Sequence, residues 1–464
     1  MKVLMMTSPA PKRSPFFTGE KRPPLGVGIL LSILRNSGHE IFFSDEYLKK
    51  SNILKSDFLF KKKIDFVGIY TNTICFQGTL ALLTELENNR KKGWKGKIMV
   101  GGPHTSVAAK DFPEFVDYIV IGEGEYAILD IVEGRVTQRI IIGEKVKNLN
   151  ELPRPAWDMF VNLPYNWGYK TLKAYPIITL NTSRGCPFDC KFCSVNSIWG
   201  RNYRTTSAER IFEDILYLKR KYGIKGIYFR EDNFTLNKNR VVKLCNLLIE
   251  NNIDITWICE TRADSLQDFD YVLTMAKSGC KVFYIGVESG SPRMLELMNK
   301  GITVEHIINA FKNAKEAGIY IYASFIYGLP SETNKDIELT ERLIERIKPK
   351  YISRNVFVGI PGSELYNYVE ENNLYEYRDK NNLLYLKDHN KRVDKYYNGN
   401  PYAKIPRTAS FFDYRIYEFK KVIRIIFRKI LYLMGKLIDS FELGGLRNSI
   451  IKSLKILREK LNRI

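Results

Sequence analysis

Short apolar runs alternate with longer amphipathic segments along the first 140 residues of the chain. The spacing predicts helices at 26–36 and 76–89, and short strands at 2–7, 40–44, 66–70, 97–100 and 118–121. Strands that alternate with helices of ten or more residues indicate a parallel sheet with crossover helices. Because such sheets bind ligands beyond the carboxyl ends of their strands, we expect a ligand site at residues 71–73, 101–104 and 122–125.

The same alternation returns after a proline-rich stretch at 152–157, which is typical of a linker. Further strands are predicted at 177–181, 226–230, 254–259, 281–287, 319–326 and 351–357. Six such units favour a full or partial parallel barrel, whose chemistry lies at the carboxyl ends of the strands. We therefore predict four regions: an α/β domain at 1–150, a linker at 151–175, a barrel at 176–375, and a basic helical C-terminal region at 376–464.

Charge and cysteine content narrow the class of protein. The chain has 72 Lys and Arg against 51 Asp and Glu, a formal charge of +21 that favours polyanionic neighbours. It has no run of about 18 uncharged apolar residues, so we expect no membrane-spanning helix. Its first residues turn polar quickly, which predicts no signal peptide. We expect a reduced protein of the cytoplasm.

Much of the positive charge lies at the C-terminal end. Residues 415–464 contain 13 Lys and Arg and 4 Asp and Glu, and their apolar residues recur at helical spacing. Basic amphipathic helices of this kind can lie on an anionic membrane, which predicts a peripheral position on the inner face of the membrane. Plain packing against the barrel is the alternative, and nucleic-acid binding is less favoured.

Three of the seven cysteines form a cluster in the sequence. Cys186, Cys190 and Cys193 follow the first predicted barrel strand, whereas the other four stand singly in apolar runs typical of a core. Three thiolates can hold three irons of a cubane cluster that normally takes four cysteines, which leaves one iron open to a small ligand. Zinc is less favoured because its sites use four ligands in paired knuckles.

This cysteine loop at the start of a six-unit barrel resembles that of the radical S-adenosylmethionine (SAM) superfamily. The resemblance implies a [4Fe–4S] cluster whose open iron binds SAM, and reductive cleavage of SAM to a 5′-deoxyadenosyl radical. At 230–234 the chain departs from the Gly-Gly-Glu segment of many members and resembles an acidic Asp-Asp-x-Phe form. The SAM contacts that the resemblance implies are Phe192, Glu231, Asp232, Arg262, Glu288, Ser289, Tyr327 and Gly328.

The first domain lacks Gly-x-Gly-x-x-Gly at its first turn, so dinucleotide binding is poorly supported. Beside a radical SAM barrel it is similar to the flavodoxin-like or Rossmann-like domain of the cobalamin-dependent subgroup. The usual Asp-x-His-x-x-Gly segment is replaced by residues 8–11, which implies cobalamin without a protein histidine below the cobalt. A domain that has lost its cofactor is the alternative. The cobalamin contacts that the resemblance implies are Thr71, Thr73, Gly101, Gly102, His104, Gly122, Glu123 and Gly124.

The resemblance implies a cobalamin-dependent radical SAM enzyme that methylates an unactivated carbon, and the basic amphipathic C-terminal region favours a lipid-like or isoprenoid substrate. Such an enzyme needs an external electron donor such as flavodoxin or ferredoxin. Radical cyclisation or oxidative rearrangement of a lipid or tetrapyrrole with the same cofactors is one alternative, and a cobalamin or iron–sulfur sensor is another. Methylthiolation of tRNA is disfavoured because residues 1–150 contain only Cys75, too few for a second cluster. The sequence does not indicate acid–base residues.

Overall fold

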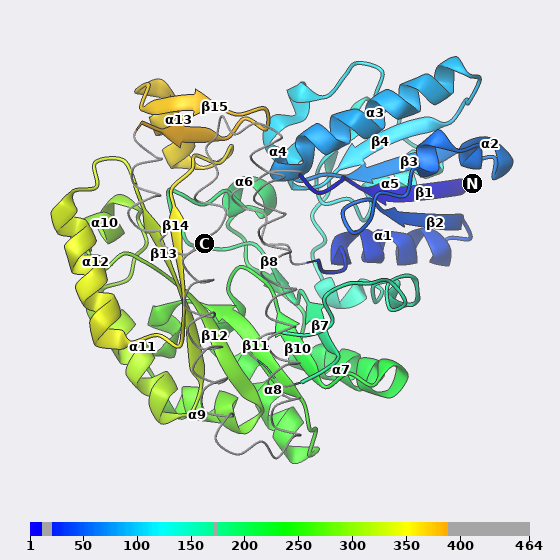
Figure 1. Ribbon diagram of the computed structural model, residues 1–464. Helices are drawn as coiled ribbons and strands as arrows, with labels where there is room; N and C mark the ends of the chain where they lie inside the picture. Colours follow the sequence, from blue (N-terminus) through cyan, green and yellow to red (C-terminus); the bar gives the residue numbers. More distant parts are fainter. Residues whose placement is uncertain (12–20, 170–171, 173, 388–464) are drawn as a thin grey trace, which may run out of the picture. The chain divides into compact units, whose positions relative to one another are not determined.

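The computed structural model describes residues 1–11, 21–169, 172 and 174–387, and these belong to one compact unit, Met1–Arg392. They contain two six-stranded parallel sheets, drawn in Figure 1 in blue to cyan and in green to yellow. The basic helices predicted within 415–464 lie outside the described residues.

The N-terminal sheet has the strand order β2-β1-β3-β4-β5-β6, and every neighbouring pair is parallel. Its first five strands were predicted. β6 was not predicted, because its run of three isoleucines at 140–142 is shorter than the about four to eight residues expected of a strand, and its residues are exposed or half-buried. The strands are β1 (Lys2–Thr7), β2 (Glu40–Asp45), β3 (Phe66–Tyr70), β4 (Lys97–Gly101), β5 (Tyr118–Gly122) and β6 (Ile140–Gly143).

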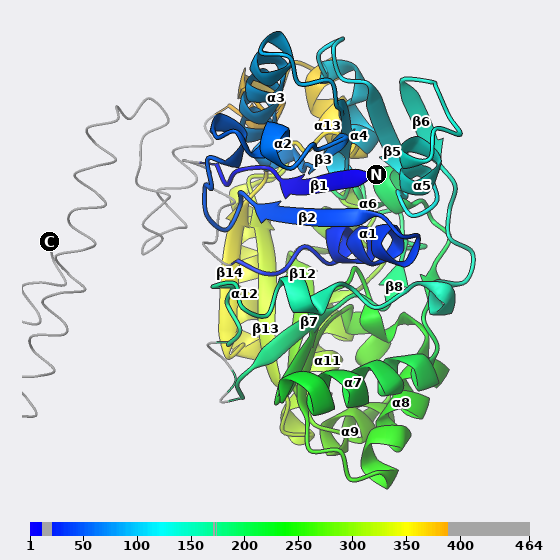
Figure 2. The same cartoon turned by 90° about the vertical axis from the view of Figure 1, so that its right-hand side faces the viewer.

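Helices cover both faces of this sheet, with α1 and α3 on opposite faces (Figures 1 and 2). On the α3 face, buried Leu4, Val67 and Ile98 of the sheet pack with Leu83 and Leu86 of the helix. The helices are α1 (Leu25–Asn36), α2 (Phe58–Lys61), α3 (Phe76–Lys91), α4 (Pro103–Ala108) and α5 (Ala127–Val132), with 3-10 turns η1 (Ile53–Lys55), η2 (Thr73–Cys75), η3 (Ala109–Asp111) and η4 (Leu149–Glu151).

The second sheet has the order β14-β13-β12-β11-β10-β7, again parallel throughout. All six predicted strands are confirmed. The barrel is a partial one, because β7 and β14 are the two ends of the sheet in the described part of the chain. The strands are β7 (Ile177–Leu180), β10 (Gly226–Phe229), β11 (Thr256–Thr261), β12 (Cys280–Glu288), β13 (Tyr320–Tyr327) and β14 (Tyr351–Val356).

The barrel helices lie on its outer side (Figure 1), and their ends follow from local sequence. At α7, the Ser207 hydroxyl accepts a hydrogen bond from the Arg210 amide, and Gly223 ends the helix at a φ of 63°. Thr333 and Asp336 form a capping box at the start of α12. The helices are α7 (Ala208–Tyr222), α8 (Lys238–Glu250), α9 (Phe269–Lys277), α10 (Pro292–Leu297), α11 (Val304–Glu316) and α12 (Asn334–Ile347), with turns η6 (Phe234–Leu236) and η7 (Ala263–Leu266).

The stretch predicted as a linker is packed against the first domain. The Ala156 amide donates to the Gly28 carbonyl of α1 at 2.9 Å. Trp157 and Phe160, in and after η5 (Trp157–Met159), are fully buried. A Cβ at Gly28 would lie 2.7 Å from the Phe160 ring, so the glycine allows this close contact.

The region at 376–464, predicted to be helical, begins with strands. After α13 (Glu364–Glu371), the strands β15 (Tyr375–Arg378) and β16 (Leu384–Leu386) form an antiparallel hairpin. Tyr377 and Tyr385 are paired across the two strands, and their rings stack with centroids 4.6 Å apart. Strand pairing thus continues past residue 376.

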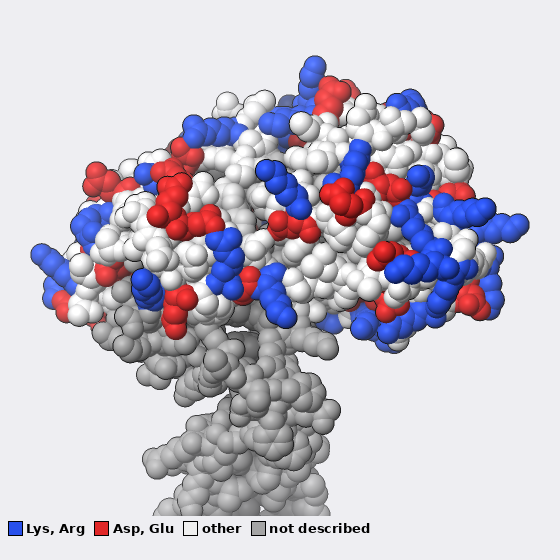
Figure 3. Space-filling model, turned by 90° about the horizontal axis from the view of Figure 1, so that it is seen from above, with Lys and Arg blue, Asp and Glu red and all other residues white. Residues whose placement is uncertain are grey.

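The surface of the described part carries charges of both signs. Figure 3 shows Lys and Arg interspersed with Asp and Glu over the face in view. Among the described residues, every helix is too short or too polar to cross a membrane.

Candidate functional site

Cys186, Cys190 and Cys193 lie on one loop at the carboxyl end of β7. The loop begins at a small ribbon of β8 (Ser183–Arg184) and β9 (Arg204–Thr205) and ends at α6 (Val195–Trp199). Gly185 has a φ of +85°, and a Cβ there would lie 2.4 Å from the Asn202 carbonyl oxygen. Only glycine fits this position, which turns the chain from the ribbon into the loop.

Neighbouring segments hold the cysteine loop in place. The Lys191 amide donates to the Met298 carbonyl at 2.9 Å, and the Asn299 side chain donates to the Asp189 carbonyl at 2.9 Å. The Arg262 guanidinium lies 3.6 Å from the centroid of the Phe188 ring. The loop is therefore fixed from two sides before any ligand binds.

The donor set fits an iron–sulfur cluster. Burial raises the pKa of Cys193 to about 11 and raises the pKa of Cys186, so these thiols need a nearby cation to become thiolates. Among the described residues, no group of three His, Cys, Asp or Glu side chains converges on one metal ion. A cubane cluster does not require the three thiols to converge on one metal ion, because each cysteine binds a different iron.

Three of the predicted SAM residues lie together beside this loop. Arg262 is 3.9 Å from Cys190 Sγ and donates to the Lys300 carbonyl at 2.8 Å. The Lys300 ammonium is 3.0 Å from Glu288 Oε1 and 5.5 Å from the centroid of the Phe192 ring. Phe192, Arg262 and Glu288 thus lie around Lys300, next to Cys190 of the cysteine loop. The sequence analysis missed Lys300, which carries no motif signal of its own.

Three other predicted SAM residues bond to groups on the outer, helical side of the barrel. The Ser289 hydroxyl is 3.1 Å from that of Thr340 in α12. Tyr327 donates to Glu341 of α12 at 2.6 Å, and the Gly328 amide donates to Glu332. The structure therefore separates Ser289 and Tyr327 from the group around Phe192, because successive strand residues face opposite sides of a sheet.

Glu231 and Asp232 follow β10 but differ in their surroundings. Glu231 is buried and accepts bonds from the Thr182 amide and hydroxyl at 3.1 and 2.7 Å, and from the Ser183 hydroxyl. It therefore ties the end of β10 to the end of β7. Burial raises the pKa of Asp232 to about 7, and the charges of Glu260 and Glu231 add to the rise.

A cavity of about 640 Å³ connects this end of the barrel with the N-terminal sheet. The barrel contributes Thr179–Arg184, Trp199 and Arg230–Asp232, and the sheet contributes the carboxyl ends of β1, β3, β4 and β5. Five predicted cobalamin residues line it, namely Gly101, Gly102, Gly122, Glu123 and Gly124. Two predicted SAM residues, Glu231 and Asp232, line the same cavity.

The cavity wall has glycines that leave room for a large ligand against the backbone. Its sheet side includes Met5, Gly68 and Met99, and a Cβ at Gly68 would lie 2.6 Å from Met5 Sδ. Gly102 has a φ of +110°, and a Cβ there would lie 2.5 Å from the Thr71 carbonyl oxygen. These two glycines are required by contacts within the protein. At Gly101, Gly122 and Gly124 a Cβ would meet no protein atom closer than 3.6 Å, so these three glycines leave room for a ligand against the backbone.

The other predicted cobalamin residues do not line this cavity. His104 is buried in the core, with its ring 4.2 Å from that of Phe76 and 5.9 Å from that of Phe112. Burial lowers its pKa to about 4. Thr71 bonds to Thr79 at 2.6 Å. The side chains of His104 and Thr71 pack within the domain, and neither residue lines this cavity.

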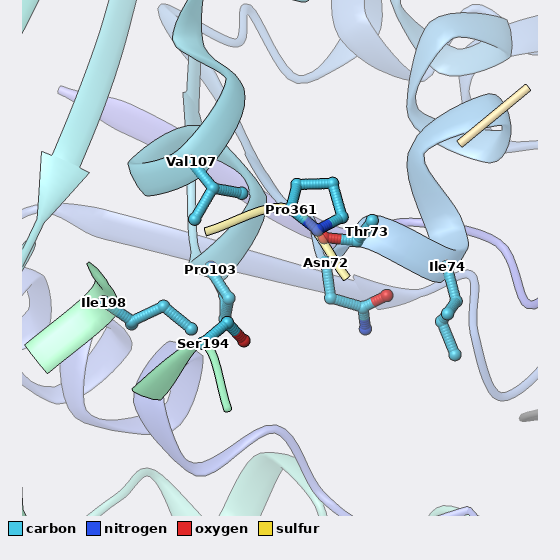
Figure 4. Close-up of a pocket in the computed structure, with 8 residues that line it drawn as sticks. All are labelled: Asn72, Thr73, Ile74, Pro103, Val107, Ser194, Ile198 and Pro361. Carbon is cyan, nitrogen blue, oxygen red and sulfur yellow. The ribbon is translucent and has the colours of Figure 1, made fainter. Parts of the chain in front are cut away.

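Thr73 lines a second, smaller cavity of about 140 Å³ beside the cysteine loop. In Figure 4, Asn72 and Thr73 lie on one side of this space, and Pro103, Ser194 and Ile198 lie on the other. Ser194 directly follows Cys193, so the ends of β3 and β4 lie next to the loop that carries the thiols.

A buried ion cluster joins the two sheets at the same place. Arg184, two residues before Cys186, is 2.7 Å from Glu123 and also pairs with Glu125. Arg204 pairs with Glu123 as well, and the Val146 amide donates to Glu123 at 3.0 Å. Burial alone would raise the pKa of Glu123, but Arg204 and Arg184 hold it below its ordinary value. Glu123 thus links the cavity wall to the cysteine loop.

Family models match both halves of the chain. The Radical SAM superfamily model matches residues 180–344, and the B12 binding domain model matches residues 18–132. The two matches cover the barrel and the N-terminal sheet respectively.

Relatives from several organisms resemble most of the chain. An uncharacterized methyltransferase of Pyrococcus horikoshii is 31% identical over 80% of this chain and 84% of its own length. The anaerobic magnesium-protoporphyrin IX monomethyl ester cyclase of Rubrivivax gelatinosus is 25% identical over 74% of this chain and 66% of its own length. The hopanoid C-3 methylase of Methylococcus capsulatus is 26% identical over 74% of this chain and 68% of its own length.

Among solved structures, the cobalamin-dependent S-adenosylmethionine radical enzyme OxsB, with aqua-cobalamin and S-adenosylmethionine bound, has a similar fold. Its TM-score is 0.70 at 18% identity, covering 100% of this chain and 80% of that chain. At this identity the likeness is one of fold.

Proposed function

Because the chain belongs to the radical SAM superfamily, in the group that also carries a B12-binding domain, we propose that it methylates an unactivated carbon of a lipid-like or isoprenoid molecule. It is an enzyme that uses a [4Fe–4S] cluster, SAM and cobalamin. The observation that carries the proposal is the single cavity lined both by the glycine loops of the N-terminal sheet and by the barrel strand ends beside the cysteine loop. One cavity allows a methyl donor and a radical source to reach the same substrate.

When bound, the cluster with SAM supplies a 5′-deoxyadenosyl radical, and cobalamin supplies the methyl group. Cys186, Cys190 and Cys193 would hold the cluster. Arg262, Glu288 and Lys300 would hold the polar groups of SAM, since they lie around Cys190 and Phe192. Their mutual bonds keep them in place before binding, which lowers the cost of ordering.

The N-terminal wall would position cobalamin and exclude water. Gly101, Gly122 and Gly124 would allow close approach of its ring. Glu123 would hold this wall against the cysteine loop through Arg184 and Arg204. Water is thereby kept from a reactive carbon radical, as enclosed sites do.

The proposal is tested anaerobically with the reconstituted protein, SAM, a reductant and a host lipid extract. We expect 5′-deoxyadenosine and S-adenosylhomocysteine to rise together, and only when the extract is present. The matched control is the triple Cys186→Ala, Cys190→Ala, Cys193→Ala variant, which should form neither. Deoxyadenosine without S-adenosylhomocysteine would exclude methyl transfer.

That last outcome would favour a second candidate, radical cyclisation or oxidative rearrangement. A specific observation supports it: the relative from Rubrivivax gelatinosus is a cyclase of a tetrapyrrole. The same cavity and loop would serve both reactions, because both begin with hydrogen abstraction by the deoxyadenosyl radical. Reduction of the cluster needs an external donor, and we propose flavodoxin or ferredoxin.

We also propose that residues 415–464 bring the enzyme to an anionic membrane, which suits an apolar substrate. Their 13 Lys and Arg against 4 Asp and Glu support this. The full chain should sediment with vesicles that contain phosphatidylglycerol and not with pure phosphatidylcholine, and salt should weaken the binding. Replacing Lys420, Lys421 and Arg424 with Glu should abolish it; equal binding to both vesicles would refute the proposal.

A further inference from the structure

Residues 357–386, which we call the clasp, contact both the N-terminal domain and the cysteine loop. They comprise the loop after β14, helix α13 and the β15–β16 hairpin. Val358, Leu383 and Tyr385 are buried together within the clasp, and Ile74 of the N-terminal domain packs against them. Ile74 also lines the large cavity, so the clasp packs against part of its wall.

The tip of the hairpin bonds to two further segments of the N-terminal domain. The Gln77 side chain, in α3, donates to the Lys380 carbonyl at 2.6 Å, and the Asn382 side chain donates to the Asp111 carboxylate at 2.6 Å. The Asp379 carboxylate shapes the tip by accepting two backbone amides of the same turn, at 2.8 and 3.0 Å. Gln77 and Asp111 belong to the segments after β3 and β4, whose ends line the cavity, so the tip holds both segments.

The other end of the clasp bonds to the cysteine loop. The Leu365 amide, in α13, donates to the Lys191 carbonyl at 2.8 Å, and the Leu365 side chain is buried. Lys191 directly follows Cys190. The ion pair of Lys191 with Glu364 is exposed to solvent and adds little. The backbone bond and the buried leucine therefore make this contact.

Between its two ends, the clasp passes at Gly362 between helices α4 and α6. A Cβ at Gly362 would lie 2.6 Å from Val107 Cγ1 of α4 and 3.1 Å from Ser197 Cβ of α6. The Ser197 hydroxyl donates to the Gly362 carbonyl at 2.6 Å. In Figure 4 the preceding residue, Pro361, borders the same small cavity as Val107. Since α6 follows the cysteine loop, this glycine touches both sides.

We propose that the clasp fixes the cavity wall of the N-terminal sheet against the cysteine loop, and that Gln77 and Gly362 are positioning residues for the reaction. This inference rests on the proposed function, in which a methyl donor and a radical source must reach one substrate. A misplacement of about 1 Å can cost about 100-fold in rate. A single element that contacts both sides keeps their spacing constant.

Gly362→Ala and Gly318→Ala form a matched pair that tests the clasp. The two glycines have φ values of +88° and +75°, but a Cβ at Gly318 would meet nothing within 4 Å. Both substitutions strain the backbone, whereas only Gly362→Ala presses on α4 and α6. In the reconstituted protein, Gly362→Ala should change the electron paramagnetic resonance spectrum of the reduced cluster and lower the cobalamin-to-iron ratio at least about twofold. Gly318→Ala should change neither, and identical results for the two variants would overturn the proposal.

Hydrogen exchange tests whether the two ends of the clasp act as one unit. Gln77→Ala combined with Asn382→Gly removes the side-chain bonds at the tip, and glycine suits residue 382 because Asn382 has a φ of +61°. Exchange of the Leu365 amide, at the other end, should quicken at least about tenfold, the effect of one to two hydrogen bonds. The control is Gln138→Ala, at an exposed residue before β6, which should leave this exchange unchanged. Unchanged exchange in the double variant would refute the proposal, even if Gly362→Ala does not fold.

These measurements need no substrate and therefore separate the clasp from the proposed function. If both give the expected results while the wild type fails to cleave SAM with any extract, the proposed function fails and the clasp stands. If the wild type forms 5′-deoxyadenosine and S-adenosylhomocysteine while Leu365 exchange is unaffected in the double variant, the clasp fails and the proposed function stands.

Discussion

At the scale of single residues, burial decides what a titratable side chain does. His104 follows the glycine pair at the end of β4, where the sequence favoured a ligand contact, yet it lies among aromatic rings with its Nδ1 3.2 Å from the Thr73 hydroxyl. Burial lowers its pKa to about 4, so it stays neutral at ordinary pH. Its role in this structure is that of a core residue.

This position predicts a pH dependence of stability. Protons bind more readily to His104 in the unfolded chain, with its ordinary pKa of about 6.5, than in the folded chain. The contribution of neutral His104 to the free energy of unfolding is therefore full above about pH 6.5 and is lost as the pH falls toward 4. Between pH 7 and pH 5 the free energy of unfolding should drop by about 2 kcal/mol on its account.

Urea denaturation of the wild type and of His104→Phe at both pH values measures this drop. The variant should be less stable at pH 7 but should lose about 2 kcal/mol less on acidification. The same pH dependence in both proteins would show that His104 is not the group responsible.

At the scale of elements, the loops after the strands depend on backbone shape. Gly102 is the N-cap of α4 and has a φ of +110°, with the Thr71 carbonyl oxygen in the way of any Cβ. At the adjacent Gly101, a Cβ would meet only Val120, at 3.8 Å. A side chain at residue 102 would therefore clash with the backbone, whereas an alanine methyl group at residue 101 has room.

Gly102→Ala should destabilise the protein by at least about 1 kcal/mol and reduce its bound cobalamin, because the loop must move to relieve the clash. Gly101→Ala is the matched control and should change stability by less than about 0.5 kcal/mol. Thermal unfolding and the cobalamin-to-iron ratio after reconstitution give both readouts. Similar effects of the two substitutions would contradict the argument.

Most strands and the longer helices were predictable because their apolar periodicity is local. The edge strand β6 was not, since its run of three isoleucines is too short to indicate a strand by itself and its residues are partly exposed. The hairpin of β15 and β16 was also missed, because charged residues alternate with tyrosines there and the pattern is typical of a surface segment.

At the scale of the whole molecule, the ion pairs of Glu123 link the loop after β5 of the N-terminal sheet to the ribbon that flanks the cysteine loop. Its side chain is 2% exposed and faces Arg184 and Arg204. Removing one partner of a buried ion pair leaves the others uncompensated, which typically costs about 3–5 kcal/mol.

Glu123→Gln should therefore lower the free energy of unfolding by about 3 kcal/mol. It should also change the electron paramagnetic resonance spectrum of the reduced iron–sulfur cluster, since Arg184 lies two residues before Cys186. Glu144→Gln is the control, because Glu144 is exposed and should change neither property. An unchanged spectrum with a large loss of stability would limit Glu123 to a structural role.

The sequence by itself determined the two sheets, the three-cysteine loop and its place after the first barrel strand, because each depends on residues close together in the chain. Only the tertiary structure decided which residues share a site. It brought Lys300 to Glu288, moved His104 into the core, turned Tyr327 toward α12, and left the Thr179 hydroxyl unpaired in the cavity wall. Burial and pairing depend on residues far apart in the chain, and no local pattern records them.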